Sequence, residues 1–322
     1  MDRLSLDGLD RAIVCALQVD ARVTWGRLAD VLGASERTIA RRVHRLTAPG
    51  VLRIVGVASP YFAGYATPLI VRARCAAGAV PSVLGNLARR NDTLWVDLLV
   101  GGLDICFVTF AGSRESRNAF LFKELPGIDH LTDVSVYTML HNFSDAEIWH
   151  GGHLTAGQYA ALRAGVPQGE PPHGRDLTAD ERALLSVLAR DGRAGYGELG
   201  SAIHASESTA RRRFLGLVEE RAVGFHTEIE LSLLGFHAEV MLWISVRPAA
   251  LDRVGRALAA QPNVRFAAAT TGPVNLVASV CARDLPELYD FLVDVAGGLP
   301  EVDRIETTPI VRTVKRSGVL RR

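Results

Sequence analysis

The chain has 322 residues, of which 48% are hydrophobic, and a formal net charge of +1 at pH 7. This length and apolar content can fill several cores, so we expect two to four compact units. Because the net charge is nearly zero, the chain as a whole has no excess of positive charge that would attract a polyanion such as DNA. Any nucleic-acid footprint must therefore be a local patch of basic residues.

No apolar run approaches the roughly 20 residues that a membrane span needs. Met1 leads into a polar segment instead of a signal-peptide core. The cysteines Cys15, Cys75, Cys106 and Cys281 stand singly in apolar runs without a CxxC pair, which is typical of reduced core thiols. We therefore expect a soluble, cytoplasmic protein with no cofactor, no metal and no membrane contact.

The sequence repeats itself over most of its length in one register. The matched positions include Asp10 with Glu181, Ser35 with Ser206, Arg41 with Arg212, Leu46 with Leu217, Gly101 with Gly272, and Asp104 with Asn275. A period this long indicates a duplicated unit of several elements and not a solenoid repeat. Between the copies, GVPQGEPPHG predicts an exposed linker, preceded by a possible short helix from Thr155 to Arg163.

The first copy opens with three predicted helices. Asp7 and Asp10 can cap the first helix, and the second runs from about Trp25 to Leu32. Gly33 can adopt the left-handed conformation of a tight turn, and Ser35 can cap the third helix. This order of helices and turn predicts a helix-turn-helix, whose second helix reads the DNA major groove.

The third predicted helix has one apolar and one basic face. Ile39, Val43 and Leu46 have the spacing of core residues, which leaves the arginines outside. Arginines there can bond phosphates and guanine edges, and the serine end of the helix offers free N–H groups to a phosphate. The candidate DNA contacts are Ser35, Arg37, Thr38, Arg41, Arg42 and Arg45, with Arg42 at the boundary of the two faces.

The second copy keeps this pattern with fewer outward cations. Thr178 and Glu181 form a predicted capping box, but His204 replaces the turn glycine and Gly216 stands where copy one has Arg45. Its candidate DNA contacts are Ser206, Thr209, Arg212 and Arg213. We expect copy one to dominate DNA binding, because Arg37 is also replaced, by Ser208.

After the helices, each copy alternates strand and helix signals in the order βαββαβ, from PLIVRARC to DVSVYTML in copy one. This order predicts a ferredoxin-like sheet with both helices on one face, so its other face must be covered. Two such sheets in one chain can cover each other, which makes each chain a covalent pseudo-dimer. The fold class is α+β, with two winged-helix-like helix-turn-helix domains and two ferredoxin-like domains.

The predicted boundaries follow the repeat. They are residues 1–50 for the first helix-turn-helix, 51–65 for a connecting strand, 66–145 for the first ferredoxin-like domain, 146–176 for the linker, 177–222 for the second helix-turn-helix, 223–236 for its connecting strand, and 237–316 for the second ferredoxin-like domain.

With these motifs, the chain resembles the Lrp/AsnC (feast/famine) family of transcriptional regulators, twice over nearly its whole length. The resemblance implies sequence-specific binding to double-stranded DNA, homo-oligomers (dimers or higher of intrachain pseudo-dimers), and a small amino-acid-like effector. It also implies an effector site at the turn between the second and third strands of each βαββαβ module. Those turns contain Gly101, Gly102 and Asp104 in copy one, and Thr271, Gly272 and Asn275 in copy two.

Glycine N–H groups at such a turn can bind a carboxylate, and Asp104 can hold an ammonium group. Alternatively, these residues serve only to supply positive φ in a hairpin turn. Gly101-Gly102 stands where the family more often has Thr-Gly, and Asn275 removes a negative charge, so the two turns cannot be equivalent.

Two other functions remain open. Siroheme decarboxylases share this double architecture, but such an enzyme would place histidines in the ligand cleft, and the central strands TLWVDLLV and ICFVTF contain none. His150 and His153 have the spacing of a metal pair, yet no third ligand is spaced with them, and a polar linker explains them better. The other function is that of an oligomerisation partner without DNA binding.

Overall fold

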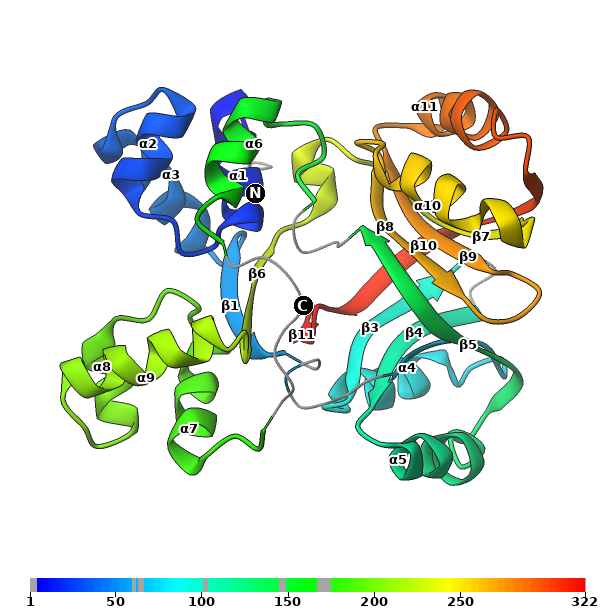
Figure 1. Cartoon of the computed structure of the whole chain (residues 1–322), viewed down its shortest axis with the longest axis horizontal. Helices are drawn as coiled ribbons and strands as arrows, with labels where there is room; N and C mark the ends of the chain where they lie inside the picture. The colour runs from blue at the N-terminus through cyan, green and yellow to red at the C-terminus, as the bar shows by residue number, and fades with distance from the viewer. Residues whose placement is uncertain are drawn as a thin grey trace. The chain divides into compact units, whose positions relative to one another are not determined.

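The computed structural model describes residues 5–59, 62, 67–100, 104–144, 149–166 and 175–321. The chain forms two compact units, each built from both copies of the repeat (Figure 1). Unit 1 contains Met1–Gly64 and Glu147–Leu234, and unit 2 contains Tyr65–Ala146 and Gly235–Arg322. Like elements of the two copies therefore fold together, and each unit is described by itself.

The first helix-turn-helix consists of α1 (Gly8–Val19), α2 (Trp25–Leu32) and α3 (Glu36–Thr47). The predicted caps are confirmed: Asp7 and Asp10 form a capping box on α1, and Ser35 caps α3. Gly33 ends α2 at φ 65°, the left-handed conformation that the sharp turn into α3 requires. Ile39, Val43 and Leu46 are buried in the core, as their spacing predicts.

The second helix-turn-helix consists of α7 (Ala179–Leu188), α8 (Tyr196–Ala202) and α9 (Glu207–Glu219). Thr178 and Glu181 form the predicted capping box. At the position of Gly33, His204 takes the same left-handed conformation with φ 52°. A side chain with a Cβ there costs about 1–2 kcal/mol of backbone energy, so the turn is kept at some expense of stability.

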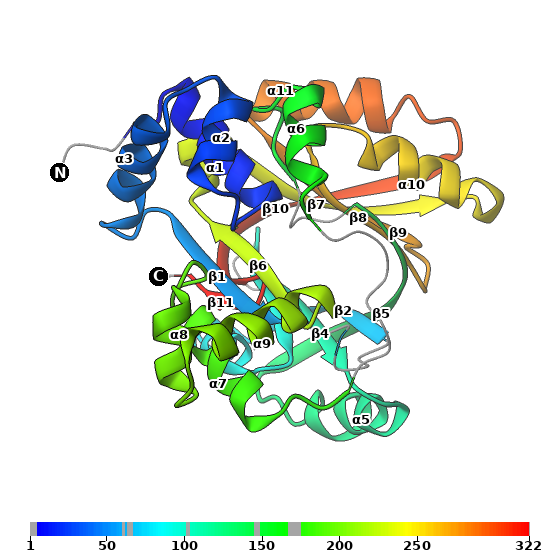
Figure 2. The ribbon, with the colours of Figure 1, turned by 60° about the vertical axis from the view of Figure 1, so that its left-hand side comes forward.

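The two helix-turn-helix domains are joined by their connecting strands. Strand β1 (Arg53–Ala58) pairs antiparallel with β6 (Val223–Glu228), and Figure 2 shows the two strands side by side. Thr227 also donates its hydroxyl to the carbonyl of Leu17 at 2.7 Å, which attaches β6 to the first helix bundle. Unit 1 is thus an intrachain pair of helix-turn-helix modules.

Two equivalent arginines reinforce this pairing. Arg22 and Arg193 occupy matching positions of the repeat, and each guanidinium donates to two backbone carbonyls of the other copy. The acceptors are Gly192 and Ala194 for Arg22, at 2.5 and 3.3 Å, and Ala21 and Val23 for Arg193, at 2.7 and 3.0 Å. Arg22 also lies 4.5 Å from the ring centroid of Phe214, and Arg193 lies 3.8 Å from that of Trp25. The contact is reciprocal, like that of a twofold dimer.

The predicted linker helix exists as α6 (Ala156–Arg163), with Thr155 as its N-cap. It packs against α1 and α2 of the first copy. Gln158 donates its side-chain amide to the carbonyl of Val31 at 3.3 Å, and Arg27 donates to the carbonyl of Ala161. The first helix-turn-helix is therefore supported by a helix that follows it in the chain.

Each half of unit 2 has the βαββαβ order that the sequence predicts. The first half contains β2 (Thr67–Cys75), α4 (Val80–Arg89), β3 (Thr93–Leu99), β4 (Asp104–Ala111), α5 (Arg114–Ala119) with a π-helical turn (Phe120–Glu124), and β5 (Leu131–Ser144). The second half contains β7 (Ala238–Val246), α10 (Leu251–Ala259), β8 (Val264–Thr270), β9 (Leu276–Ala282), α11 (Leu285–Asp290) with a π-helical turn (Phe291–Ala296), and β10 (Val302–Arg316), followed by β11 (Val319–Leu320). The strand orders β5-β2-β4-β3 and β10-β7-β9-β8 are those of two ferredoxin-like sheets.

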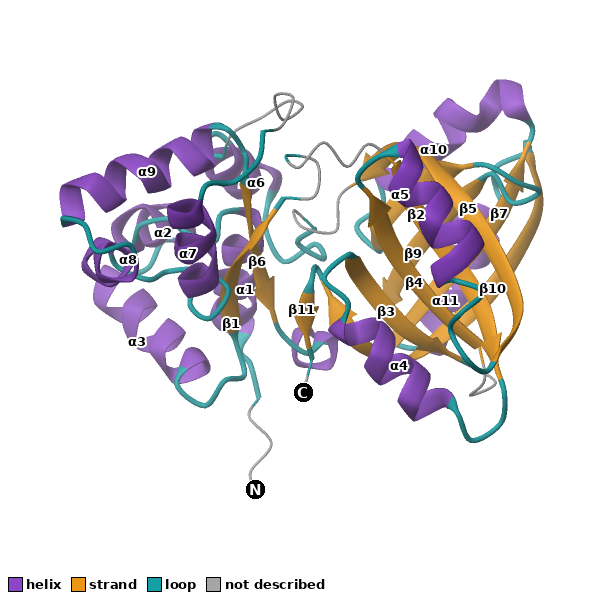
Figure 3. Cartoon of the chain, turned by 90° about the horizontal axis from the view of Figure 1, so that it is seen from below, coloured by secondary structure: helices purple, strands orange, loops and turns teal. Residues whose placement is uncertain are grey.

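The two sheets join edge to edge as well as covering each other. Strand β5 pairs with β8, and β10 pairs with both β3 and β7, so the strand pairings close into a ring. The helices lie on the outside of the strands (Figure 3). The sequence predicted that the sheets cover each other, and this is confirmed, whereas the two edge pairings are additional.

Among the described residues of unit 2, three apolar clusters form the core. One lies between each sheet and its own helices, and their members include Leu69, Leu84, Phe107, Leu242, Val254 and Leu276. The third contains residues of both sheets and lies between them, with Ile70, Phe110, Tyr137, Met241, Trp243 and Phe266 among its members. In this third cluster, the apolar face of each sheet is buried against that of the other, as the sequence predicted.

We also searched the described residues for membrane-spanning helices, metal-binding groups and disulfides. Within the described ranges, no helix is long and apolar enough to cross a membrane, and no three His, Cys, Asp or Glu side chains form a metal-binding group. All four cysteines are free and buried, as expected of core thiols.

We predict that Arg22→Met destabilises the protein by about 2–3 kcal/mol, because the two buried carbonyls of Gly192 and Ala194 lose a charged hydrogen-bond donor. Chemical denaturation measures this free energy of unfolding. Arg190→Met is the control, since Arg190 is exposed in the neighbouring loop, and it is expected to change the free energy by less than about 0.5 kcal/mol. Equal effects of the two substitutions would contradict a role of Arg22 in joining the modules.

Candidate functional site

Helix α3 presents a basic face to solvent. Ser35 accepts a hydrogen bond from the backbone N–H of Thr38 at 3.2 Å, and their hydroxyl oxygens lie 2.8 Å apart. Arg37, Arg41 and Arg45 are exposed, as predicted. Within the described part of the chain, the side chains of Arg37 and Arg41 have no hydrogen bond or ion pair, so they are available to an outside anion.

The other two arginines of α3 are bound to acidic residues at the start of α1. Arg42 lies 2.6 Å from Asp7 and 2.8 Å from Asp10, and Arg45 lies 2.6 Å from Asp10. The Arg42 hydrogen bond lowers the pKa of Asp7 to about 2, so this carboxylate stays ionised at any physiological pH. The sequence placed Arg45 outward, which is confirmed, but it gave no sign of the ion pair.

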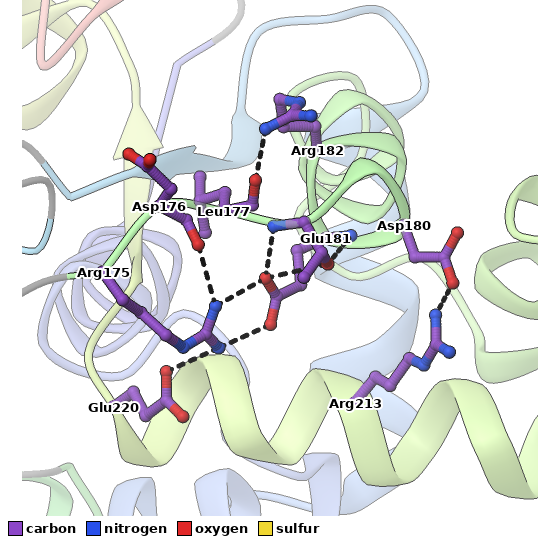
Figure 4. A network of polar contacts seen from close by, with 9 residues as sticks. Arg175, Asp176, Leu177, Asp180, Glu181, Arg182, Arg213 and Glu220 are labelled. Carbon is purple, nitrogen blue, oxygen red and sulfur yellow. Dashed lines mark hydrogen bonds and ion pairs between the residues drawn. The ribbon is translucent and has the colours of Figure 1, made fainter.

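The second copy differs in which cations are free. Ser206 caps α9 by accepting from the backbone N–H of Thr209 at 3.3 Å. Arg213 forms an ion pair with Asp180 (Figure 4), whereas Arg212 is exposed. Arg211, next to it, is also exposed, and the comparison of the copies missed it because copy one has Ala40 there. Three consecutive arginines, Arg211 to Arg213, are visible in the sequence and could have indicated this extra cation.

A clamp around Arg175 is specific to copy two. Its guanidinium lies 2.6 Å from Glu181 at the start of α7 and 2.9 Å from Glu220 at the end of α9 (Figure 4). Arg175 lowers the pKa of Glu181 to about 2. The first and third helices of this copy are therefore held together by a charge that copy one does not have, since Leu4 occupies the matching position.

At the turn of copy one that was predicted to bind the effector, Gly101 and Gly102 lie outside the described residues. Asp104 begins β4, and its carboxylate lies 2.8 Å from Arg74 and 3.9 Å from Arg72. Arg72 also reaches Glu306 of the second half at 2.7 Å, and lies 5.1 Å from the ring centroid of Trp243. Asp104 thus belongs to a charged network that crosses from one sheet to the other.

In copy two, the side chains of the turn are occupied by backbone groups. Asn275 accepts from the N–H of Val246 and donates to its carbonyl, both at 2.8 Å. Thr271 accepts from the backbone N–H of Thr138 in the first half at 3.0 Å. Gly272 has φ 101°, so it supplies the positive φ that this turn needs. One donor and one acceptor position of the Asn275 amide are therefore already used within the protein.

The linker histidines pack inside unit 1. His153 contacts the carbonyl of Leu234 at 3.0 Å, and the ring of His150 lies 4.8 Å from that of Tyr159. Burial lowers the pKa of both histidines, so they are neutral at pH 7. These contacts give them a packing role.

Family comparisons agree with the geometry of both units. The AsnC-type helix-turn-helix domain matches residues 6–47 and again residues 177–217, and the Lrp/AsnC ligand binding domain matches residues 239–320. An uncharacterized HTH-type transcriptional regulator from Pyrococcus horikoshii is 31% identical over 153 residues, which is 47% of this chain and 96% of that protein. The HTH-type transcriptional regulator LrpA from the same organism is 24% identical over 136 residues, covering 42% of this chain and 96% of LrpA.

The double architecture also occurs in a solved structure. The crystal structure of the siroheme decarboxylase NirDL matches with a TM-score of 0.61 and 15% identity, over 96% of this chain and 93% of that chain. At this identity, the likeness shows a shared fold alone. The two matched helix-turn-helix segments, the matched ligand-binding domain and the curated relatives show that the chain belongs to the Lrp/AsnC family of transcriptional regulators, with the family's modules present twice in one polypeptide.

Proposed function

We propose that the protein is a sequence-specific regulator that binds double-stranded DNA mainly through α3 and responds to a small amino-acid-like effector. DNA binding through α3 is supported mainly by two exposed arginines, Arg37 and Arg41, on this helix, which follows the Gly33 turn. Ser35 and Thr38 are proposed as phosphate contacts through their hydroxyls, at the end of α3 whose first N–H groups have no partner within the helix.

The paired arginines have a different proposed role. Arg42 and Arg45 in copy one, and Arg213 in copy two, are each held by a carboxylate of the first helix. Their charge is already compensated by that carboxylate, so they contribute less affinity for DNA than a free arginine. The remaining proposed contacts of copy two are Ser206, Thr209 and Arg212, joined by Arg211.

We predict that Arg41→Ala weakens DNA binding more than Arg212→Ala at the matching position of copy two. Loss of one phosphate contact lowers the slope of log K against log salt by about 0.9. Binding of the two variants to one operator, measured over a series of salt concentrations, gives both slopes. Equal losses of affinity in the two variants would contradict the dominance of copy one. If neither substitution changed the affinity for DNA, the protein would be better explained as an assembly partner without DNA binding.

We propose the effector site at the copy-one turn, with Gly101 and Gly102 offering backbone donors and Asp104 an acceptor. Support comes from Asp104 and Arg74, which lie together at the start of β4 and present both signs of charge, as recognition of a zwitterion requires. The copy-two turn of Thr271, Gly272 and Asn275 is proposed as the weaker site, because its polar side chains already bond the backbone.

Asp104→Asn is predicted to weaken binding of an amino-acid effector about tenfold, because a charged contact of about 1.5–3 kcal/mol becomes a neutral one of about 1 kcal/mol. A screen of the twenty amino acids by thermal shift identifies the ligand, and calorimetry measures its affinity. Asp129→Asn, at an exposed position of the same half, is the control and is expected to leave the affinity unchanged. A ligand that is indifferent to Asp104→Asn would reduce the turn to a structural role.

We propose further association of chains into dimers or higher even multiples. The support is the exposure of apolar side chains on the outer helix α11, where Leu285 is 71% and Tyr289 is 66% exposed. Light scattering at micromolar concentration is expected to give at least twice the chain mass of 34.7 kDa. A strictly monomeric mass would exclude this association.

We propose no catalytic activity. The alternative, a decarboxylase of the same architecture, is favoured only by the fold shared with NirDL. Against it, strands β3 and β4 contain no histidine, and the linker histidines are engaged in packing. Incubation of the protein with siroheme, followed by mass spectrometry of the tetrapyrrole, tests this: loss of carbon dioxide from the substrate would reverse the proposal.

A further inference from the structure

Among the described residues, the two halves of unit 2 meet at two edge junctions, where matching positions of the repeat come together. At one junction β5 pairs with β8 and contacts α10, and at the other β10 pairs with β3 and contacts α4. If the halves were identical, both junctions would contain the same side chains, and each half would also fit a half of its own kind. The side chains at the two junctions are different, so this symmetry is lost.

At the β5–β8 junction, a phenylalanine fills the space over a glycine. Phe143 of β5 packs on Gly255 of α10, and a Cβ atom at Gly255 would overlap the Phe143 ring. At the β10–β3 junction, the matching residues are Val314 and Leu84. Leu84 is buried in the apolar cluster of the first half, and Val314 packs against the same cluster. One junction thus combines a large side chain with none, and the other combines two side chains of medium size.

This difference in size works against the pairing of like halves. In a pair of two copy-one halves, Phe143 would meet Leu84 in place of a glycine, and the junction would be overpacked. In a pair of two copy-two halves, Val314 would meet Gly255, and a cavity would remain. A twofold pair contains each mismatch twice, so both like pairings are less stable than the unlike one.

Charge is a second obstacle to the pairing of two copy-one halves. Arg72 of β2 and Trp243 of β7 occupy matching positions and face each other, with the guanidinium 5.1 Å from the ring centroid. Arg72 also forms an ion pair at 2.7 Å with Glu306 of the second half, whose matching residue in the first half is Ser135. In a copy-one pair, Arg72 would face a second Arg72, with a serine in place of Glu306, and like charges repel.

The hydrogen bonds of unit 1 do not make this distinction. They run from Arg22 and Arg193 to backbone carbonyls, and both copies provide the same donor and the same kind of acceptor. Such bonds would form equally between two copy-one modules or two copy-two modules. The choice of partner therefore depends on unit 2.

We propose that the junction surfaces of unit 2 accept only the unlike half. A copy-one half pairs with a copy-two half, of the same chain or of a second chain, and not with another copy-one half. Fusion of two modules would by itself leave like pairing between chains open, and the differences at Phe143, Gly255 and Arg72 exclude it. This inference does not depend on the proposed function.

The test reproduces each like junction inside one intact chain. Gly255→Leu sets a leucine against Phe143, as in a copy-one pair, and Phe143→Val sets a valine against Gly255, as in a copy-two pair. The double variant has the side chains of the β10–β3 junction. Each single substitution is expected to lower the midpoint of thermal unfolding by about 5–10 °C, and the double variant is expected to recover most of this loss.

Gly216→Leu is the control, because Gly216 also lies within a helix, α9, but a Cβ atom there would have no neighbour within 4 Å. It is expected not to lower the midpoint. Val314→Phe, rescued by Leu84→Gly, repeats the test at the second junction. Losses that simply add at one of the junctions overturn the proposal. If Gly255→Leu alone does not fold, recovery of folding in the double variant supports the proposal, and a double variant that stays unfolded overturns it.

Discussion

The pairing of edge strands between the two halves is the interaction on which the rest of unit 2 depends. Strands β3 and β5 would be the open edges of one sheet, and β8 and β10 those of the other. Their mutual pairing satisfies the backbone groups of all four and turns the apolar face of each sheet inward. Neither half can achieve this alone, so the second copy is a structural requirement of the first.

Local signals in the sequence predicted most of the elements. The caps at Asp7, Ser35 and Thr178, and the spacing of Ile39, Val43 and Leu46, act within one helix, and the structure confirms each of them. The edge pairings were not predictable in this way, because strand alternation identifies a face of a strand but not its neighbour. The reciprocal contacts of Arg22 and Arg193 were hidden for a similar reason: their acceptors are backbone carbonyls, which every sequence contains.

For the candidate site, the sequence predicted which arginine side chains are exposed better than it predicted which of them form ion pairs. Helical spacing placed Arg41 and Arg45 outward correctly, yet only the fold shows that Arg45 is bound to Asp10 and Arg41 is not. The partners in such ion pairs are far apart in the chain and meet through packing. Asn275 is a further case: the loss of charge relative to Asp104 was visible, but its two hydrogen bonds to Val246 were not.

The closed ring also changes how the assembly responds to dilution. Between separate subunits, the β3–β10 and β5–β8 pairings would be a bimolecular equilibrium, and the halves would part as the protein became scarce. In one chain, each half meets the other at an effective concentration that the connecting segment fixes, whatever the concentration of the protein. The paired state of both units is therefore independent of copy number, and each DNA-binding module always has its counterpart beside it.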